Sequence, residues 1–264
     1  MKCQIDDIAI HYKIIGTGRP VLMIHEFGPD HRLMLGCMEP LFKEKRGWRR
    51  IYFDLPGMGR TPGPERLFNS DRMLDVVHGF VDQIIPGEPY CVAGQSYGGY
   101  LARGLAAHDS MRIKGMLLLC PVVYADAARR NLPKQVVLEA EPGLLERLSP
   151  EERSAFESVA VIRTGATLRK YARDILPGSA AADVAFLERL KETGYVFSFE
   201  TGLASAVLDK PVLIVAGRQD GIVGYEDAWD LAPCYPHATY AVLDRVGHNA
   251  QIEQPALFAA LAGE

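Results

Sequence analysis

The sequence contains no apolar run long enough to cross a membrane. Its longest apolar stretches, Met116–Cys120 and Pro211–Ala216, fall far below the roughly 20 residues that a membrane-spanning helix needs. The first seven residues lack the apolar core of a signal peptide, so no secretory leader is expected. Repeats and low-complexity segments are also lacking, which excludes a fibrous chain. We therefore predict a cytoplasmic protein without a membrane partner.

Cysteine is scarce, and positive charge is not in excess. The five cysteines are scattered and form no Cys-x-x-Cys pair, so neither a disulfide framework nor a thiolate metal site is expected. Lys and Arg total 29 against 33 for Asp and Glu, a net charge of −4 that argues against nucleic-acid binding. The sequence also has no GxGxxG, P-loop or HExxH motif. We therefore predict no cofactor and no metal.

Short apolar segments alternate with longer segments of helical period, which is typical of an α/β protein with a parallel sheet covered on both faces. Helices are expected over residues 33–45, 70–84 and 97–108. The segments expected to form strands are rich in β-branched and aromatic residues: 8–15, 21–24, 50–53, 90–93, 116–120, 211–216 and 239–243.

The strand signal fades between residues 121 and 208. This segment is rich in Ala, Arg, Glu and Leu, and prolines divide it into short helices. The alternation of strands and helices resumes after it. We therefore predict a core domain formed by residues 1–120 and 209–264, with residues 121–208 inserted as a helical cap.

The strongest local motif is Gly94-Gln95-Ser96-Tyr97-Gly98, directly after the predicted strand 90–93. A tight turn from a strand into a helix strains the backbone of the turn residue, and only small residues fit two positions before and two after it. Such a turn exposes the serine hydroxyl at the N-terminal end of a helix, where developing negative charge is favoured. Ser96 is therefore a candidate nucleophile, although a helix-capping serine is the simpler alternative.

A serine nucleophile needs a base, and the base needs an orienting carboxylate. His248 lies in Gly247-His248-Asn249, between the predicted strand 239–243 and a helical stretch. Asp220 lies in a glycine-rich turn just past the predicted strand 211–216. The order Ser96, Asp220, His248 is the order in which α/β-hydrolases carry their triad.

With these motifs the chain resembles the α/β-hydrolase superfamily, in particular its capped small-molecule serine hydrolases. Further matching segments are His25-Glu26-Phe27-Gly28, residues 54–61 and Gly217-Arg218-Gln219-Asp220. The resemblance implies an α/β-hydrolase fold with a mostly parallel sheet of about eight strands. Some members place the triad acid after an earlier strand, where Asp126 lies, but Asp220 stands in the loop that the family uses.

The resemblance also assigns the oxyanion hole to the backbone N–H groups of Phe27 and Tyr97, with His25 supporting the loop. The chain departs from the family at Glu26, where the common pattern has glycine. Our preferred interpretation is that the Glu26 carboxylate braces the loop, and substrate contact or an acid–base role are the alternatives. Tyr124 and Val223 are further candidates for substrate contact.

Other polar residues have simpler explanations. His108 and His237 are interpreted as surface or loop residues. The glutamates of the predicted cap are interpreted as a solvated face, and contact of one or two with a substrate amine is the alternative: Glu139, Glu141, Glu146, Glu151 and Glu152.

The sequence thus predicts a monomeric or homodimeric serine hydrolase that acts on a small, partly apolar carboxylic ester, thioester or lactone through an acyl-enzyme on Ser96. Four alternatives stay open: an amidase like the proline iminopeptidases, a C–C bond hydrolase, a lyase and a ligand receptor with little turnover.

Overall fold

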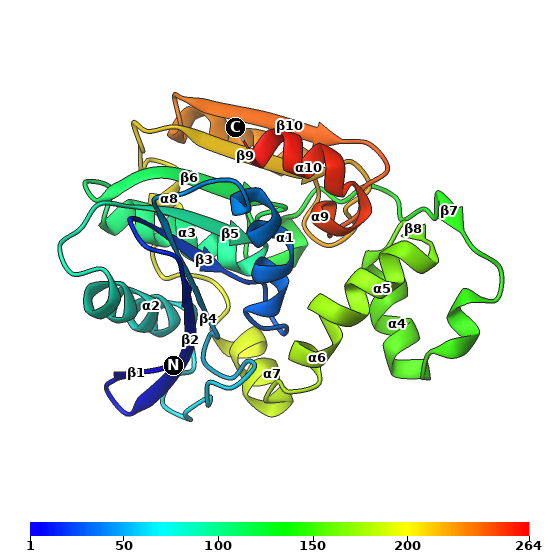
Figure 1. Cartoon of the computed structure of the whole chain (residues 1–264), viewed down its shortest axis with the longest axis horizontal. Coiled ribbons are helices and arrows are strands. Elements are labelled where there is room, and N and C mark those ends of the chain that lie inside the picture. Colours follow the sequence, from blue (N-terminus) through cyan, green and yellow to red (C-terminus); the bar gives the residue numbers. More distant parts are fainter. Residues whose placement is uncertain (264) are drawn as a thin grey trace.

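An eight-stranded sheet runs through the molecule in the computed structural model, which describes residues 1–263 (Figure 1). The strand order is β1-β2-β4-β3-β5-β6-β9-β10. The last six strands in this order are parallel to one another, and β2 pairs antiparallel with both β1 and β4. This confirms the predicted fold class. The strands are β1 (Lys2–Ile5), β2 (Ile8–Ile15), β3 (Arg19–Ile24), β4 (Trp48–Phe53), β5 (Tyr90–Gln95), β6 (Ile113–Leu119), β9 (Val212–Gly217) and β10 (Ala238–Leu243).

The central strands are near-continuous apolar runs because helices cover both faces of the sheet. In β3, for example, every residue after Arg19 is buried. Strand β1 was not predicted from the sequence. It has only four residues, and it pairs with β2 through a turn in which Asp6 has a positive φ of 49°. A strand this short carries too little pattern to be recognised.

Helices α2 (Ser70–Ile84) and α3 (Tyr97–His108) pack against each other, and α1 (Arg32–Phe42) contacts α10 (Pro255–Ala262) elsewhere on the sheet. Short α9 (Ala250–Glu253) leads into α10. The predicted helices 33–45, 70–84 and 97–108 agree with α1, α2 and α3 to within three residues. No helix within residues 1–263 has the length and apolar character needed to span a bilayer.

The segment between β6 and β9 contains several short helices, and its part from β7 to α6 projects beside the sheet (Figure 1). Phe156, Tyr171 and Ile175 of this segment form a small second core with Leu33 and Ile252. Its elements are η1 (Ala127–Arg129), β7 (Glu139–Ala140), η2 (Leu144–Arg147), α4 (Pro150–Val159), β8 (Ile162–Arg163), α5 (Gly165–Asp174), α6 (Leu176–Ser179), α7 (Val184–Thr193) and α8 (Glu200–Leu203). A further short helix, η3 (Glu226–Cys234), lies between β9 and β10.

Packing does not mark the predicted end of the cap at residue 208. Phe197, Leu203 and Leu208 belong to the main hydrophobic core rather than to the second one. Phe197 stacks on Tyr100 of α3 with ring centroids 4.2 Å apart. The division into core and cap therefore stays a prediction, and the packing places residues 197–208 with the core.

Glu253, a buried carboxylate, joins the segment between β6 and β9 to the loop that carries His248. One of its oxygens accepts hydrogen bonds from the backbone N–H groups of Val161 and Ile162, at 2.7 and 2.9 Å. The other oxygen accepts from Gly247 N at 2.6 Å. Because Glu253 is the acceptor for these three donors within residues 1–263, it fixes the His248 loop against β8.

Replacing Glu253 by Gln puts an amide N–H₂ where a backbone N–H now donates. We expect the free energy of unfolding to fall by about 1–3 kcal/mol, because a buried donor loses its acceptor. Urea denaturation of Glu253→Gln measures this, with Glu146→Gln, at an exposed position, as the matched control. Equal stability of the two variants would contradict the proposed role.

Candidate active site

Ser96 lies at the turn between β5 and α3, in the strand–turn–helix context on which its interpretation depends. Its backbone has φ 53° and ψ −114°, a strained conformation for a residue with a side chain. A Cβ atom on Gly94 would lie 2.3 Å from Gly98 O, and one on Gly98 would lie 2.3 Å from Ile24 O. Glycine is therefore required at both positions, as the motif predicts.

His248 and Asp220 are brought together by a close backbone approach. A Cβ on Gly217 would lie 2.0 Å from Gly247 O, so the two loops touch directly. His248 Nδ1 lies 2.8 Å from Asp220 Oδ2. The other carboxylate oxygen of Asp220 accepts hydrogen bonds from the N–H groups of Ile222 and Val223. Asp220 is fully buried and held on both oxygens, as an orienting acid should be.

Asp126 has a different environment. Its side chain is exposed, and its carboxylate caps η1 by accepting a hydrogen bond from Ala128 N at 2.9 Å. Its only side-chain hydrogen bond within the described chain is this one, whereas Asp220 holds the imidazole. The geometry therefore favours Asp220 as the acid.

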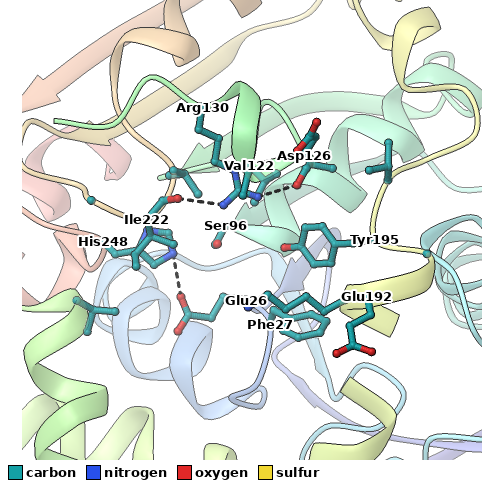
Figure 2. A pocket seen from close by; sticks show the side chains of 18 of the residues that line it. Glu26, Phe27, Ser96, Val122, Asp126, Arg130, Glu192, Tyr195, Ile222 and His248 are labelled. Carbon is teal, nitrogen blue, oxygen red and sulfur yellow. Dashed lines mark hydrogen bonds and ion pairs between the residues drawn. The ribbon is translucent and has the colours of Figure 1, made fainter. Parts of the chain in front are cut away.

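The Glu26 side chain lies against His248, the candidate base, rather than within its own loop (Figure 2). Its Oε2 is 3.5 Å from His248 Nε2 and accepts a hydrogen bond from Gln95 Nε2 at 3.2 Å. Gln95 also donates to Asn249 Oδ1, and Gln251 donates to Gln95 Oε1. The partners of Glu26 thus belong to the serine turn and the histidine loop, which differs from the loop-bracing role that we preferred from the sequence.

The protonation of His248 and Glu26 is coupled. Burial raises the pKa of the Glu26 carboxyl to about 7; the nearby His248 opposes this rise and Asp220 adds to it. Burial alone lowers the pKa of His248, but the carboxylates of Asp220 and Glu26 outweigh burial and raise that pKa to about 8. The two carboxylates thus favour the protonated form of His248.

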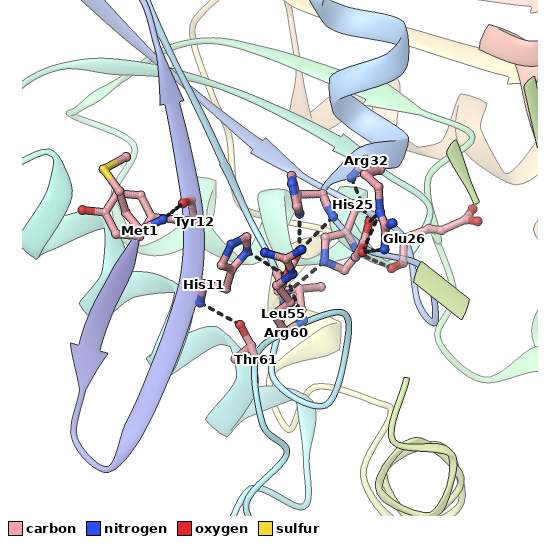
Figure 3. Close-up of polar contacts among 12 residues, drawn as sticks. Met1, His11, Tyr12, His25, Glu26, Arg32, Leu55, Arg60 and Thr61 are labelled. Carbon is pink, nitrogen blue, oxygen red and sulfur yellow. Dashed lines mark hydrogen bonds and ion pairs between the residues drawn. The ribbon is translucent and has the colours of Figure 1, made fainter. Parts of the chain in front are cut away.

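His25 fixes the peptide that carries the predicted oxyanion donor (Figure 3). Its Nδ1 lies 2.7 Å from Glu26 O, and its Nε2 accepts a hydrogen bond from Leu55 N at 3.0 Å. Because Glu26 O and Phe27 N belong to one peptide unit, this contact also sets the direction of the Phe27 N–H. Within residues 1–263, neither Phe27 N nor Tyr97 N donates a hydrogen bond, so both are available to an oxyanion.

Ser96, His248 and Glu26 open into one cavity of about 740 Å³. Phe27, the candidate oxyanion donor, and Val223, the candidate substrate contact, also line it. Tyr124 does not line the cavity, and its hydroxyl donates a hydrogen bond to Asp230. Val122 and Ala125, close to Tyr124 in the sequence, line the cavity instead. The remaining lining residues come mostly from 125–130, 191–196 and 221–222.

The other polar candidates lie outside the cavity. His108 Nδ1 lies 2.9 Å from Gly104 O, and exposed His237 pairs with Asp209. The five glutamates of the predicted cap are exposed, and none lines the cavity, in agreement with a solvated face: Glu139, Glu141, Glu146, Glu151 and Glu152.

Two clusters in the described chain have the residue types of a metal site. His11, His31 and Asp54 form one, but both oxygens of Asp54 already accept hydrogen bonds from the two imidazoles and from the N–H groups of His31 and Arg60. The other cluster joins buried Cys120 to Asp220 and His248. Burial raises the pKa of the Cys120 thiol, which disfavours the thiolate that a metal needs. Both clusters are thus accounted for by internal hydrogen bonds and burial.

Several residues of the site were not identified from the sequence. Gln95 stands inside the serine motif, and Asn249 and Gln251 flank the histidine, so proximity to known motifs was the available signal. Arg130 lines the cavity from a loop without a motif, and no sequence pattern indicates it.

A family model described as "Alpha/beta hydrolase family" matches residues 21–261. The chain belongs to this family. It is 27% identical to 2-hydroxymuconate semialdehyde hydrolase of Pseudomonas sp. (strain CF600), covering 94% of this chain and 87% of that protein. It is 24% identical to 3-oxoadipate enol-lactonase 2 of Acinetobacter baylyi, covering 96% and 91%.

Among solved structures, this alpha/beta hydrolase is similar to an alpha/beta superfamily hydrolase from Oenococcus oeni PSU-1. The TM-score is 0.88 at 30% identity, and the match covers 98% of this chain and 96% of that one. The family and the fold expected from the motifs are thereby confirmed.

The contact between Glu26 and His248 predicts a pH profile. A general base must be neutral, so kcat/KM for an aryl ester should rise with pH through the pKa of His248, near 8. In Glu26→Gln the negative charge is lost, the protonated imidazole is less stabilised, and the rise should move to lower pH. Stopped-flow measurement of kcat/KM from pH 5 to 10 tests this, and coinciding profiles would contradict it.

The assignment of the acid predicts a ranking of two variants. Asp220→Asn should lower kcat by about four orders of magnitude, because an amide stabilises the wrong imidazole tautomer. Asp126→Asn should cost far less, since the side-chain hydrogen bond of Asp126 caps η1 and does not reach His248. Steady-state kinetics on one ester compare them, and the reverse ranking would assign the acid to Asp126.

Proposed function

We propose that this alpha/beta hydrolase is a cofactor-free serine hydrolase of small, partly apolar carboxylic esters, thioesters or lactones. The observation that carries the proposal is the arrangement around Ser96. A strained turn presents its hydroxyl to a cavity that also holds His248, which is paired with buried Asp220 at 2.8 Å. This combination supplies nucleophile, base and orienting acid.

In the proposed mechanism, Ser96 Oγ attacks the acyl carbon while His248 Nε2 accepts the hydroxyl proton. Asp220 holds the imidazole tautomer and balances the imidazolium charge. The N–H groups of Phe27 and Tyr97 hold the oxyanion, each contributing roughly 3–4 kcal/mol by analogy with measured cases. His248 then returns the proton to the leaving group, and a water molecule activated by the same base releases the acyl group from Ser96.

Glu26 influences this mechanism through the protonation of His248. Its ionised carboxylate, 3.5 Å from His248 Nε2, stabilises the protonated imidazole, which is the form that cannot accept the Ser96 proton. A substrate group that compensates the charge of Glu26 weakens this stabilisation and favours the neutral imidazole, whose Nε2 can accept the proton. We therefore propose that Glu26 is a substrate-contacting residue that also tunes the base. Val223, which lines the cavity beside His248, is retained as an apolar contact.

Cleavage of a C–C bond is the second candidate. It is favoured by the similarity to 2-hydroxymuconate semialdehyde hydrolase, and lactone opening is represented by the enol-lactonase. The same triad serves both reactions, and the cavity lining decides between them. A panel of esters, lactones and vinylogous diketones separates the candidates by relative kcat/KM.

Ser96→Ala should lower ester hydrolysis by about three to six orders of magnitude with the fold retained, because the triad acts as a unit. His248→Ala should lose a comparable amount. Activity is measured on a series of p-nitrophenyl esters, and circular dichroism checks the fold. A Ser96→Ala variant that keeps most of the wild-type rate would refute the proposed function.

A further inference from the structure

Arg130 places a positive charge, held by backbone carbonyls, in the active-site cavity. It follows η1 directly and lines the same cavity as Ser96 and His248 (Figure 2). Its guanidinium is partly buried and donates to three backbone carbonyls: Nε to Tyr124 O at 2.9 Å, Nη1 to Ile222 O at 3.0 Å and Nη2 to Ala125 O at 2.9 Å. These contacts hold the planar group in one orientation.

The three contacts leave the positive charge of Arg130 uncompensated. All three acceptors are neutral carbonyls, and no carboxylate within residues 1–263 lies within 4.0 Å of its guanidinium nitrogens. Neighbouring Arg129, by contrast, pairs with Glu200 at 3.1 Å. A guanidinium has five N–H groups, so two of those on Arg130 remain, one on each terminal nitrogen.

The other charged residues of the cavity do not neutralise Arg130. Asp126, Lys191 and Glu192 are exposed at its rim, where solvent screens their charges. The interior groups are Glu26 and His248, which face each other, and Arg130 itself. The charge of Arg130 reaches the catalytic base, since it opposes the rise in the pKa of His248.

A fixed guanidinium with one free N–H on each terminal nitrogen matches the two oxygens of a carboxylate. We propose that Arg130 binds a carboxylate of the substrate, so that the substrate class is acyl compounds with a second, anionic end, such as half-esters of dicarboxylic acids. This proposal rests on the hydrolase activity proposed above. Arg130 thereby selects the substrate, whereas Ser96 and His248 perform the chemistry.

The kinetic test compares matched substrates. Monoethyl succinate, glutarate and adipate are each paired with the uncharged ethyl ester of equal acyl length, and proton release is followed in a pH-stat. Selectivity is the ratio of kcat/KM for the half-ester to that for the neutral ester. We expect wild type to prefer the half-esters, and Arg130→Met to lose about 10- to 100-fold of this selectivity.

Two further variants separate charge from structure. Arg130→Lys keeps the charge without the fork and should retain part of the selectivity. Lys191→Met, which removes the cation at the rim, should retain all of it. Equal losses on both substrates in Arg130→Met would show that Arg130 only clamps the loops at Tyr124 and Ile222, and this would overturn the proposal. Loss of selectivity in Lys191→Met instead would also overturn it.

Binding without turnover separates this inference from the proposed function. In a Ser96→Ala background, calorimetry should detect glutarate or adipate, and the additional Arg130→Met change should weaken that binding about 10-fold or more. Dicarboxylate binding that depends on Arg130 supports the subsite even if every ester tested is a poor substrate. Dicarboxylate affinity that is absent, or independent of Arg130, refutes the subsite even if Ser96 hydrolyses esters.

Discussion

The backbone of Ser96 is the constraint on which the site depends. A positive φ at a residue with a side chain costs free energy, and the surrounding structure must stabilise it. Here α3 lies so close to the ends of β5 and β3 that Gly94 and Gly98 leave no room for a Cβ. The hydroxyl is consequently held at the N-terminal end of α3, at the carboxyl edge of a parallel sheet, where other loops can supply a base and oxyanion donors.

A second close approach completes the site from the other side. Gly217 and Gly247 bring the loops after β9 and β10 into contact, and buried Asp220 therefore meets His248. Glu253 then connects the His248 loop to β8, because its carboxylate accepts hydrogen bonds from Gly247 N on one side and from Val161 N and Ile162 N on the other. The position of His248 is thus determined by backbone contacts on one side and by a buried carboxylate on the other.

The charged groups around His248 determine its pKa. Asp220 holds one imidazole nitrogen and Glu26 faces the other, which raises the pKa of His248 despite its burial. Arg130 opposes them from within the cavity. A cavity with one fixed cation and one titratable carboxylate suits a substrate that is partly polar and asymmetric, in agreement with the proposed carboxylate-bearing esters.

Local motifs were predictable from the sequence, whereas contacts between distant segments were not. The strand–turn–helix at Ser96, the central strands and the family followed from short segments whose geometry depends on their own residues. The orientation of Glu26, the exclusion of Tyr124 from the cavity and the role of Arg130 depend on segments far apart in the chain. Tyr124 turns outward because Asp230, over a hundred residues later, accepts its hydroxyl.

Covalent labelling tests the central claim, an activated Ser96, most directly. The intact protein is treated with a fluorophosphonate at pH 8, and its mass and peptide map are measured. A single phosphonyl adduct on Ser96, lost in Ser96→Ala and strongly slowed in Asp220→Asn, is the predicted result. An unmodified Ser96, with no adduct or with the adduct on another residue, would contradict the account.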